Sequence, residues 1–229
     1  MSQNFLKRLI TSIILLSLLL FANYSHQNIF ILSIFILASI ICVEANNIFS
    51  KLVMPQYLKK KLSKKKFNSK FLILNLITFC YVFFVFCILS YKIHQLEGPT
   101  FFLYVISICF FTDIGGYIIG KIIGGKKLSK ISPNKTISGT TGSFIFSIIP
   151  LMIISEFNYL NLEINTNNII FCLLISLISQ LGDLFISFLK RKAKIKDTGK
   201  ILPGHGGILD RVDGIIFAVP FSYFLLKLF

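Results

Sequence analysis

Long apolar runs separated by short polar connections make up most of the chain. Seven such runs can be traced, at residues 9–24, 29–49, 71–91, 100–120, 139–156, 169–189 and 212–228. Most of them approach the roughly 20 residues that an α-helix needs to cross a bilayer. Backbone groups in hydrocarbon must be hydrogen-bonded within their own segment, and the runs lack the alternation of an outer-membrane barrel. The pattern therefore predicts an all-α, polytopic integral membrane protein with about seven transmembrane helices.

Composition supports this class and limits the number of domains. With 55% hydrophobic and only 14% charged residues in 229 positions, the chain cannot enclose its apolar surface in one water-soluble core. No connection is long enough for a second domain, so we expect a single membrane domain over 1–229, with N-terminal helices in 1–99 and the candidate chemistry in 100–229. Lys7 and Arg8 precede the first run as in a signal peptide, but residues 23–27 offer no small-residue cleavage site, and we expect a retained helix.

Basic residues fall almost entirely on one side of the predicted membrane. If the N-terminus is cytoplasmic and seven helices follow, 22 of the 24 Lys and Arg residues lie on the cytoplasmic side. The positive-inside rule therefore predicts a multi-pass protein of the inner (cytoplasmic) membrane with a cytoplasmic N-terminus. The net charge of +15 does not indicate nucleic-acid binding, because no soluble domain or recognition helix accompanies it. The lysine cluster at 59–66 is interpreted as a topology anchor, with binding of anionic lipid headgroups as the alternative.

The connection at 187–214 is unusually polar, with seven basic residues and three aspartates between two apolar runs. On the helix that enters it, Asp183 and Ser187 lie one turn apart on one face. Lys190 and Arg191 extend this polar stripe to the cytoplasmic side. Polar density of this kind beside a membrane makes the connection a candidate reaction site.

Carboxylates near this connection suit a magnesium ion. Asp210 and Asp213 are three residues apart at the start of the last predicted helix and should share a face. Folding the connection back would bring Asp183 close to Asp210. Magnesium prefers oxygen ligands, and one or two carboxylates together with substrate phosphates commonly complete its shell. The alternative is that these aspartates pair with nearby lysine and arginine side chains and only fix the topology.

A second polar segment, 112–142, ends on the same face. Asp113 lies within an apolar run, and a charge at mid-membrane is costly, so it should face a protein interior or a wet cavity. Ser132, Lys135 and Thr136 place two hydroxyls and an ammonium just before the next helix, whose N-terminus favours anions such as phosphate. The glycines of this segment fit either a binding loop or close helix packing.

At these residues the chain resembles the CDP-diacylglycerol synthases, also called phosphatidate cytidylyltransferases. The family signature has Ser, then Lys-Arg, Lys-Asp, Pro-Gly-His-Gly-Gly and Asp-Arg-x-Asp. Every fixed position is present, as Ser187, Lys190-Arg191, Lys196-Asp197, 203–207 and Asp210-Arg211-Val212-Asp213. Gly182-Asp183, the segment 113–117, and Ser132-Pro133 with Lys135-Thr136 are also similar to family elements.

The resemblance implies a polytopic, homodimeric enzyme that condenses CTP with phosphatidic acid to CDP-diacylglycerol and pyrophosphate at the lipid bilayer. It implies magnesium as cofactor, with a monovalent cation as a second candidate. Carried over by position, Asp183 and Asp210 resemble the metal-binding pair. They form the candidate catalytic group with Lys196, Asp197 and Asp213. The positions that resemble substrate-binding residues are Ser187, Lys190, Arg191, His205, Gly206, Gly207, Arg211, Ser132, Lys135, Thr136 and Asp113.

The sequence also departs from the family. Where members often have Ser-Pro-Lys-Lys-Thr-Trp-Glu-Gly, residues 132–139 read Ser-Pro-Asn-Lys-Thr-Ile-Ser-Gly, and fewer helices precede Asp113 than in most members. Another CTP-using transferase or a polyprenol or phytol kinase is an alternative enzyme, although the complete signature argues against it. A transporter of an anionic solute is an alternative of a different class. It would place charges along a path through several helices, whereas here the polar groups gather on one face.

Overall fold

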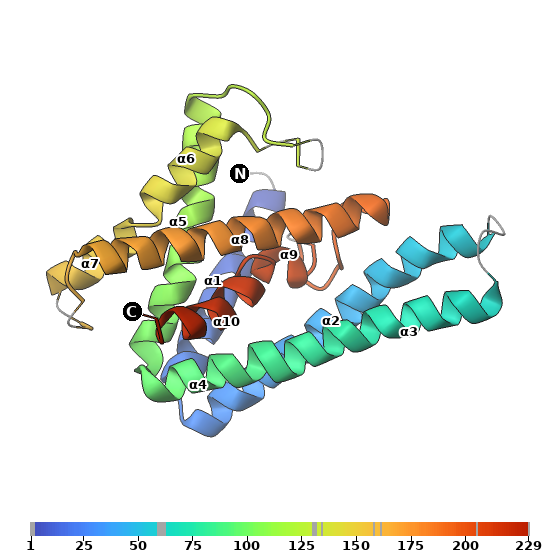
Figure 1. Cartoon of the computed structure of the whole chain (residues 1–229), viewed down its shortest axis with the longest axis horizontal. Coiled ribbons are helices and arrows are strands. Elements are labelled where there is room, and N and C mark those ends of the chain that lie inside the picture. Colours follow the sequence, from blue (N-terminus) through green and yellow to red (C-terminus); the bar gives the residue numbers. More distant parts are fainter. Residues whose placement is uncertain are drawn as a thin grey trace. The chain divides into compact units, whose positions relative to one another are not determined.

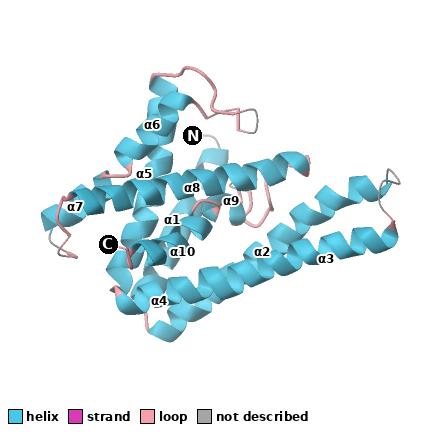
Figure 2. Cartoon of the chain, viewed as in Figure 1, coloured by secondary structure: helices cyan, strands magenta, loops and turns pink. Residues whose placement is uncertain are grey.

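The secondary structure is helical. The computed structural model describes residues 3–58, 63–129, 132–133, 135–157, 159–160, 162–204 and 206–228, and helices dominate these segments (Figures 1 and 2). Within these residues no strand forms, and the isolated bridges pair Lys127 with Thr136 and Leu202 with Gly206. The predicted all-α class is therefore confirmed.

Six helical segments in the described part of the chain are long and apolar enough to cross a membrane, as expected for a multi-pass membrane protein. They coincide with the first six predicted apolar runs. The segments are Leu6–Tyr24, Gln27–Met54, Asn68–Leu96, Gly98–Ile122, Ile137–Phe157 and Thr166–Lys192.

The last apolar run, 212–228, differs from its prediction because the helix in it is short. The helix α9 (Leu209–Val212) ends where the run begins, and after a turn at 213–214 the helix α10 (Ile215–Leu225) covers the middle of the run. At 11 residues, α10 is about 16 Å long, roughly half the thickness of the hydrocarbon core. In the turn between them, Oδ1 of Asp213 accepts a hydrogen bond from the N–H of Gly214 at 2.9 Å, an interaction that competes with helix. The prediction that Asp210 and Asp213 share a face of one helix is therefore wrong.

The chain folds into two compact units that interleave along the sequence. The first unit contains Met1–Ile88 and Leu189–Val212, and the second contains Leu89–Phe188 and Asp213–Phe229. The long helix α8 (Thr166–Lys192) passes from the second unit into the first near Leu189. The single membrane domain expected from the sequence stays a prediction, and each unit is described by itself.

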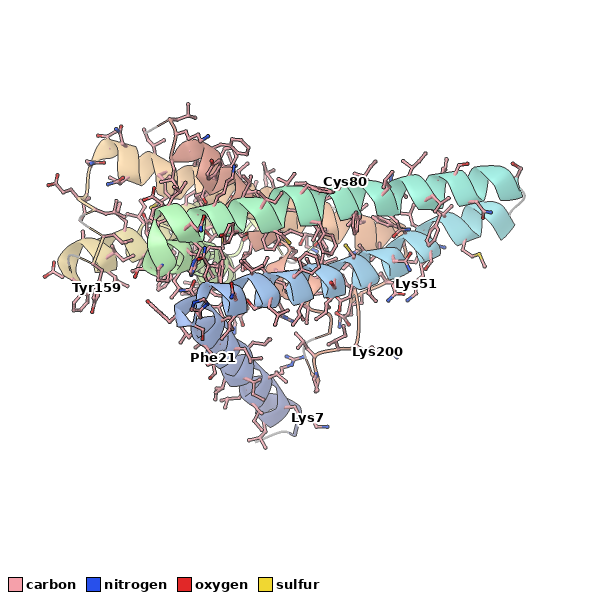
Figure 3. All side chains as sticks on the ribbon, turned by 90° about the horizontal axis from the view of Figure 1, so that it is seen from below. Lys7, Phe21, Lys51, Cys80, Tyr159 and Lys200 are labelled. Carbon is pink, nitrogen blue, oxygen red and sulfur yellow. The ribbon has the colours of Figure 1, made fainter. Side chains whose placement is uncertain are left out.

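In the first unit, α2 (Gln27–Leu58) is the central element. It contacts α1 (Gln3–Tyr24), α9, α3 (Lys64–Cys80) and the π-helical segment η1 (Tyr81–Cys87). Helices α2 and α3 run side by side in two views, and Lys51 and Cys80 mark them in the second (Figures 1 and 3). One face of α2 is buried, including Ala38, Ile41 and Ile48 at 0–1% exposure. The other elements of this unit therefore pack against the buried face of α2.

The second unit is built on α5 (Gly98–Ile122), which contacts α6 (Ile137–Phe146), α7 (Ile149–Phe157) and α10. The unit also holds α4 (Ile88–Leu96) from Leu89 onward. Glycines bring α5 and α6 into backbone contact: a Cβ added at Gly115 would lie 2.5 Å from the carbonyl oxygen of Gly142, and one at Gly139 would lie 2.8 Å from that of Gly116. These glycines therefore serve close helix packing, one of the two roles that the sequence left open.

Adding bulk at the α5–α6 contact should destabilise the second unit. A Gly142→Val side chain would press on Ile119 and on the carbonyl oxygen of Gly115, and overpacking of this kind costs about 1–3 kcal/mol. We expect a lower melting temperature for the variant in detergent, measured by size-exclusion after heating. Thr141→Val, at an exposed position of the same helix, is the control. Equal melting of both variants would contradict the packing argument.

Candidate functional site

The connection 193–208 between α8 and α9 forms an ordered loop in the first unit. Leu202 and Gly206 exchange two backbone hydrogen bonds of 2.9 and 3.1 Å, which close the turn over Pro203 and Gly204. Gly206 has a φ of 86°, a left-handed conformation that favours glycine. Leu202 and Gly206 thus define a turn through their backbone hydrogen bonds. His205, a predicted substrate-binding residue, lies outside the described residues.

Asp210 is the best-connected carboxylate of this loop region. Its Oδ2 accepts hydrogen bonds from the backbone N–H groups of Thr198 at 2.8 Å and Gly207 at 3.1 Å. Its Oδ1 accepts one from the ammonium of Lys190 at 2.7 Å, and both side chains of this ion pair are largely buried. Burial alone would raise the pKa of Asp210, but Lys190 and the two N–H groups outweigh it and hold the pKa below its ordinary value. The carboxylate is therefore ionised at neutral pH.

Glu44 of α2 reaches the same loop and is absent from the predicted site. Its Oε1 accepts the N–H of Ile208 at 3.0 Å, and its Oε2 accepts the N–H of Leu209 and the hydroxyl of Thr198, both at 2.8 Å. The residue is only 1% exposed. Its position inside the apolar run 29–49 is the signal in the sequence that indicates it, because an acid inside an apolar run needs partners.

The hydroxyl of Thr198 lies between the two carboxylates. Its Oγ1 is 2.8 Å from Oε2 of Glu44 and 3.0 Å from Oδ2 of Asp210, and it has a single proton to donate. A Cβ added at Gly207 would overlap both this hydroxyl and the Glu44 carboxylate, so only glycine fits there. The name "carboxylate cluster" is used below for Glu44, Thr198, Asp210 and Lys190.

Four other predicted residues of this region lie at the surface. Arg191, Lys196, Asp197 and Arg211 are exposed. From α1, Nε of Arg8 donates to the carbonyl oxygen of Gly204 at 2.9 Å. Cationic side chains of this region are thus exposed to solvent, while Arg8 of α1 binds the backbone of the loop.

In the second unit, Asp183 is the carboxylate that, like Asp210 in the first unit, is paired with a lysine. It forms an ion pair with Lys135 through Oδ2, and Ser187 donates a hydroxyl hydrogen bond to Oδ1 at 3.3 Å. The predicted stripe of Asp183 and Ser187 on one face of α8 is therefore confirmed. Lys135 comes from the second polar segment of the sequence, so two predicted binding elements meet here.

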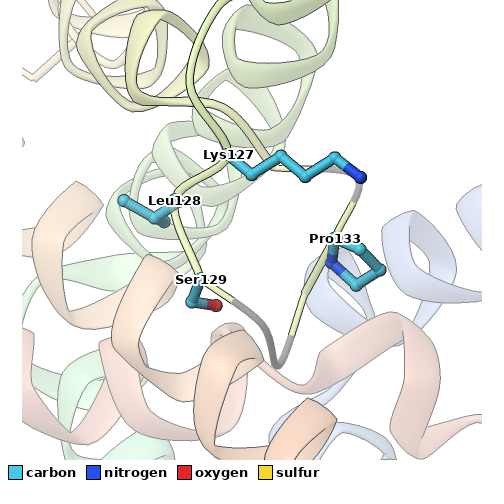
Figure 4. Close-up of a pocket in the computed structure, with 4 residues that line it drawn as sticks. All are labelled: Lys127, Leu128, Ser129 and Pro133. Atoms are coloured by element: carbon cyan, nitrogen blue, oxygen red, sulfur yellow. The ribbon is translucent and has the colours of Figure 1, made fainter.

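The loop 123–136 that carries Lys135 is tied to the start of α6. Thr136 caps this helix by accepting the N–H of Gly139 at 3.1 Å, and the N–H of Leu128 donates to the carbonyl oxygen of Lys135 at 2.8 Å. An open pocket of about 530 Å³ lies at this loop. Figure 4 shows its lining residues, Lys127, Leu128, Ser129 and Pro133. Ser132, a predicted substrate-binding residue, donates its N–H to Ser129 Oγ at 3.2 Å within the same loop.

Two further predicted residues occupy different surroundings. Asp113 of α5 is exposed, so of its two expected surroundings the protein interior is wrong, while a wet cavity stays a prediction. The neighbouring Thr112 is buried instead, and Asp113 lies beside that buried position. Asp213 is partly buried and stabilises the turn before α10.

The donor chemistry fits a magnesium ion held through few protein ligands. Among the described residues, no group of three or more His, Cys, Asp or Glu side chains converges. Asp183 and Asp210 each direct one carboxylate oxygen toward an ammonium group, which shows that each can face a cation. Magnesium typically uses one or two carboxylates and completes its shell with water and phosphate oxygens. Asp183 and Asp210 lie in different units, so their predicted proximity stays a prediction.

The sequence model described as the cytidylyltransferase family matches residues 46–229. Proteins named phosphatidate cytidylyltransferase are similar to this chain. That of Bacillus subtilis (strain 168) is 43% identical over 133 residues, which cover 58% of this chain and 49% of the relative. That of Staphylococcus aureus (strain COL) is 44% identical over 134 residues, which cover 57% and 50%. The chain therefore spans about half the length of the curated relatives it matches.

Removing the ammonium from the carboxylate cluster should destabilise the first unit. Lys190→Met leaves the largely buried Asp210 carboxylate without its cation, which costs about 1–3 kcal/mol, less than the loss for a fully buried pair. Lys200→Met, at an exposed position of the same loop, removes an equal charge and serves as control. We expect thermal melting in detergent at pH 7 to show a clear loss for Lys190→Met only. Equal stability of the two variants would contradict the expected contribution of the ion pair to the stability of the first unit.

Proposed function

Because the chain belongs to the cytidylyltransferase family, we propose that it transfers a cytidylyl group from CTP to phosphatidic acid, giving CDP-diacylglycerol and pyrophosphate. One observation carries this proposal. At the ends of the loop between α8 and α9, an ionised aspartate is paired with a lysine, and the same segment of the chain carries exposed basic side chains. A triphosphate needs such cationic surroundings, and an ionised carboxylate suits the divalent cation that accompanies it.

The reaction requires positioning more than covalent chemistry from the protein. An oxygen of the phosphatidate phosphate attacks the α-phosphorus of CTP and forms a new P–O bond. The bond from that phosphorus to the oxygen leading to the β-phosphate breaks, and the electron pair leaves with pyrophosphate. A phosphate monoester is already nucleophilic at neutral pH. The main tasks of the site are thus in-line alignment and neutralisation of developing charge.

The basic residues of both units are suited to the phosphates. Arg191, Lys196 and Arg211 are exposed on the first unit, where their charges can bind phosphate oxygens. Gly206, in its left-handed conformation, lets the backbone of the turn approach a ligand closely, whereas the space beside Gly207 is filled by Glu44 and Thr198. In the second unit, Lys135 follows Ser132 and precedes Thr136 at the start of α6. We assign these residues to substrate binding, and Asp197, Asp213 and Asp113 to supporting roles near them.

Magnesium is the proposed cofactor, with Asp183 and Asp210 as its protein ligands. When bound, it would offset the negative charge of the reacting phosphates. The ionised state of Asp210 and the cation-facing oxygens of both aspartates support this assignment. A monovalent cation as second cofactor and a homodimeric assembly rest on the family resemblance alone.

The proposed orientation places the N-terminus and the site on the cytoplasmic side of the inner membrane. Phosphatidate would then enter from the inner leaflet while CTP arrives from the cytosol. The distribution of 22 of 24 basic residues supports this orientation. The lysine cluster at 59–66, part of which lies outside the described residues, is assigned to the same side as a topology anchor.

Replacing either metal-binding aspartate should abolish the reaction. We expect Asp183→Asn and Asp210→Asn to lower magnesium-dependent pyrophosphate release and CDP-diacylglycerol formation by at least about a hundredfold, because each removes a charged ligand. Glu163→Gln, an exposed acid of the second unit, is the control and should keep wild-type activity. Purified protein, CTP, phosphatidate and magnesium are sufficient for the assay.

Two results would contradict these proposals in different ways. Near-normal activity of both aspartate variants would overturn the metal assignment while leaving the function intact. Absence of pyrophosphate release by the wild-type protein would overturn the function. A phosphorylated lipid formed with CDP as the second product would identify a CTP-dependent kinase instead.

The orientation has its own test. We expect Lys200→Cys, placed in the exposed loop of the first unit, to react with a membrane-impermeant maleimide in inverted inner-membrane vesicles. In intact spheroplasts it should stay unlabelled. The wild-type protein, whose five cysteines lie in predicted transmembrane segments, gives the background. Labelling in spheroplasts only would reverse the proposed topology.

A further inference from the structure

The carboxylate of Glu44, on α2, holds the loop between α8 and α9 in place. Glu44 accepts hydrogen bonds from the N–H groups of Ile208 and Leu209 and from the hydroxyl of Thr198. These contacts join residues that are 154 to 165 positions apart in the sequence. The loop thereby gains an anchor on α2 in addition to its own turns.

The surroundings of Glu44 make this anchor unusual. The residue is 1% exposed and sits on a helix that otherwise presents apolar side chains to the interior. Its three hydrogen bonds come from neutral donors, and two of them are backbone groups at the beginning of α9. A buried carboxylate with this arrangement is stable only while the loop is folded against it. The positions of the loop backbone and of Glu44 are therefore coupled.

The coupling extends to the proposed metal ligand. Thr198 donates its N–H to Asp210, and its hydroxyl lies within hydrogen-bond distance of both carboxylates. Gly207 also donates its N–H to Asp210, and it lies close enough to Glu44 to exclude any side chain. A shift of Glu44 must consequently move two of the groups that orient the Asp210 carboxylate.

We infer that Glu44 is a positioning residue that sets the orientation of Asp210 and of the 203–207 turn for nucleotide and metal binding. For its kinetic consequences this inference rests on the proposed function. Glu44 precedes the segment 46–229 that matches the family, as does Arg8, which binds the carbonyl oxygen of Gly204. Helices α1 and α2 therefore contribute to the site by binding the backbone of its loop.

Glu44→Gln is the direct test, because it keeps the size of the side chain but replaces one acceptor oxygen with a donor. Groups that orient metal ligands typically affect metal affinity or activity by about 10–100-fold. We expect the magnesium concentration for half-maximal pyrophosphate release to rise about tenfold. The KM for phosphatidate should stay unchanged. Glu156→Gln, the same replacement at an exposed position, should behave as wild type.

A second readout does not require the protein to be active. Lys194, Lys196 and Lys200 lie in the loop and are exposed, but trypsin can cut there only when the loop opens. We expect Glu44→Gln to accelerate cleavage at these lysines about tenfold over wild type and Glu156→Gln. Cleavage at Lys126 and Lys127 of the second unit should not change. Accelerated cleavage at both places would indicate general unfolding and would contradict a positioning role.

A compensating pair of substitutions gives a test that tolerates a damaged single variant. A Cβ added at Gly199 would overlap Oε1 of Glu44 and lie 2.9 Å from its Cδ, so Gly199→Ala should push the carboxylate out of place. Glu44→Asp retracts the carboxylate by one methylene and makes room for the added methyl group. We expect each single variant to raise the magnesium requirement and loop cleavage, and the double variant to recover much of both.

The outcomes separate the inference from the proposed function. Loss of loop protection in Glu44→Gln together with recovery in the double variant supports the inference even if the wild-type protein releases no pyrophosphate. An active wild type with unchanged magnesium dependence and unchanged loop cleavage in Glu44→Gln would overturn it. Additive damage in the double variant would also overturn it, because the two positions would then act independently.

Discussion

The buried carboxylate of Glu44 imposes the constraint on which the first unit is organised. An acid on an apolar helix is expensive to bury unless donors come to it, and here the donors come from a loop more than 150 residues away in the sequence. The loop must fold back to α2 to supply them. Its backbone can approach so closely only because Gly207 has no side chain. Once the loop is fixed in this way, Thr198 and Gly207 are in place to orient Asp210.

Hydrophobic periodicity and length predicted most of the fold, because a membrane-spanning helix must be both long and apolar. Each of the first six runs lies in a helical segment of spanning length, and in the fifth run this segment consists of α6 and α7. The last run does not form one long helix, for a local reason that a hydropathy pattern does not reveal. The Asp213 side chain accepts a hydrogen bond from the next backbone N–H and favours a turn. The glycines between 115 and 142 were ambiguous in the sequence. Their packing role became visible only when two helix backbones were seen in contact.

The candidate site was predictable where its residues cluster in the sequence and not where they meet through the fold. Lys190 and Asp210 belong to one polar connection, and the structure pairs them. Glu44 belongs to no motif and lies far from the connection, so spacing could not reveal it. The rule that an intramembrane acid needs a partner also indicates Glu44. For Asp113, which is exposed, the rule leaves a wet cavity as the predicted surroundings. The rule identifies acids that need an explanation, and only the packing of the helices decides which of them is buried.

Asp183 and Asp210, the proposed metal ligands, are each paired with a lysine. Such pairs are also what one expects if the aspartates only fix the topology. A topology lock requires opposite charges close together, and the Lys190–Asp210 pair satisfies that requirement. It does not require two backbone N–H donors on the same carboxylate, or a buried acid on another helix that holds the residues of these donors in place. These features fix the direction of the Asp210 carboxylate. A topology lock does not need a fixed carboxylate direction, whereas the proposed metal and phosphate binding would depend on it. In that proposal, the pair would also hold Lys190 where its ammonium would donate to a phosphate oxygen as well, while Asp210 stays held by the loop.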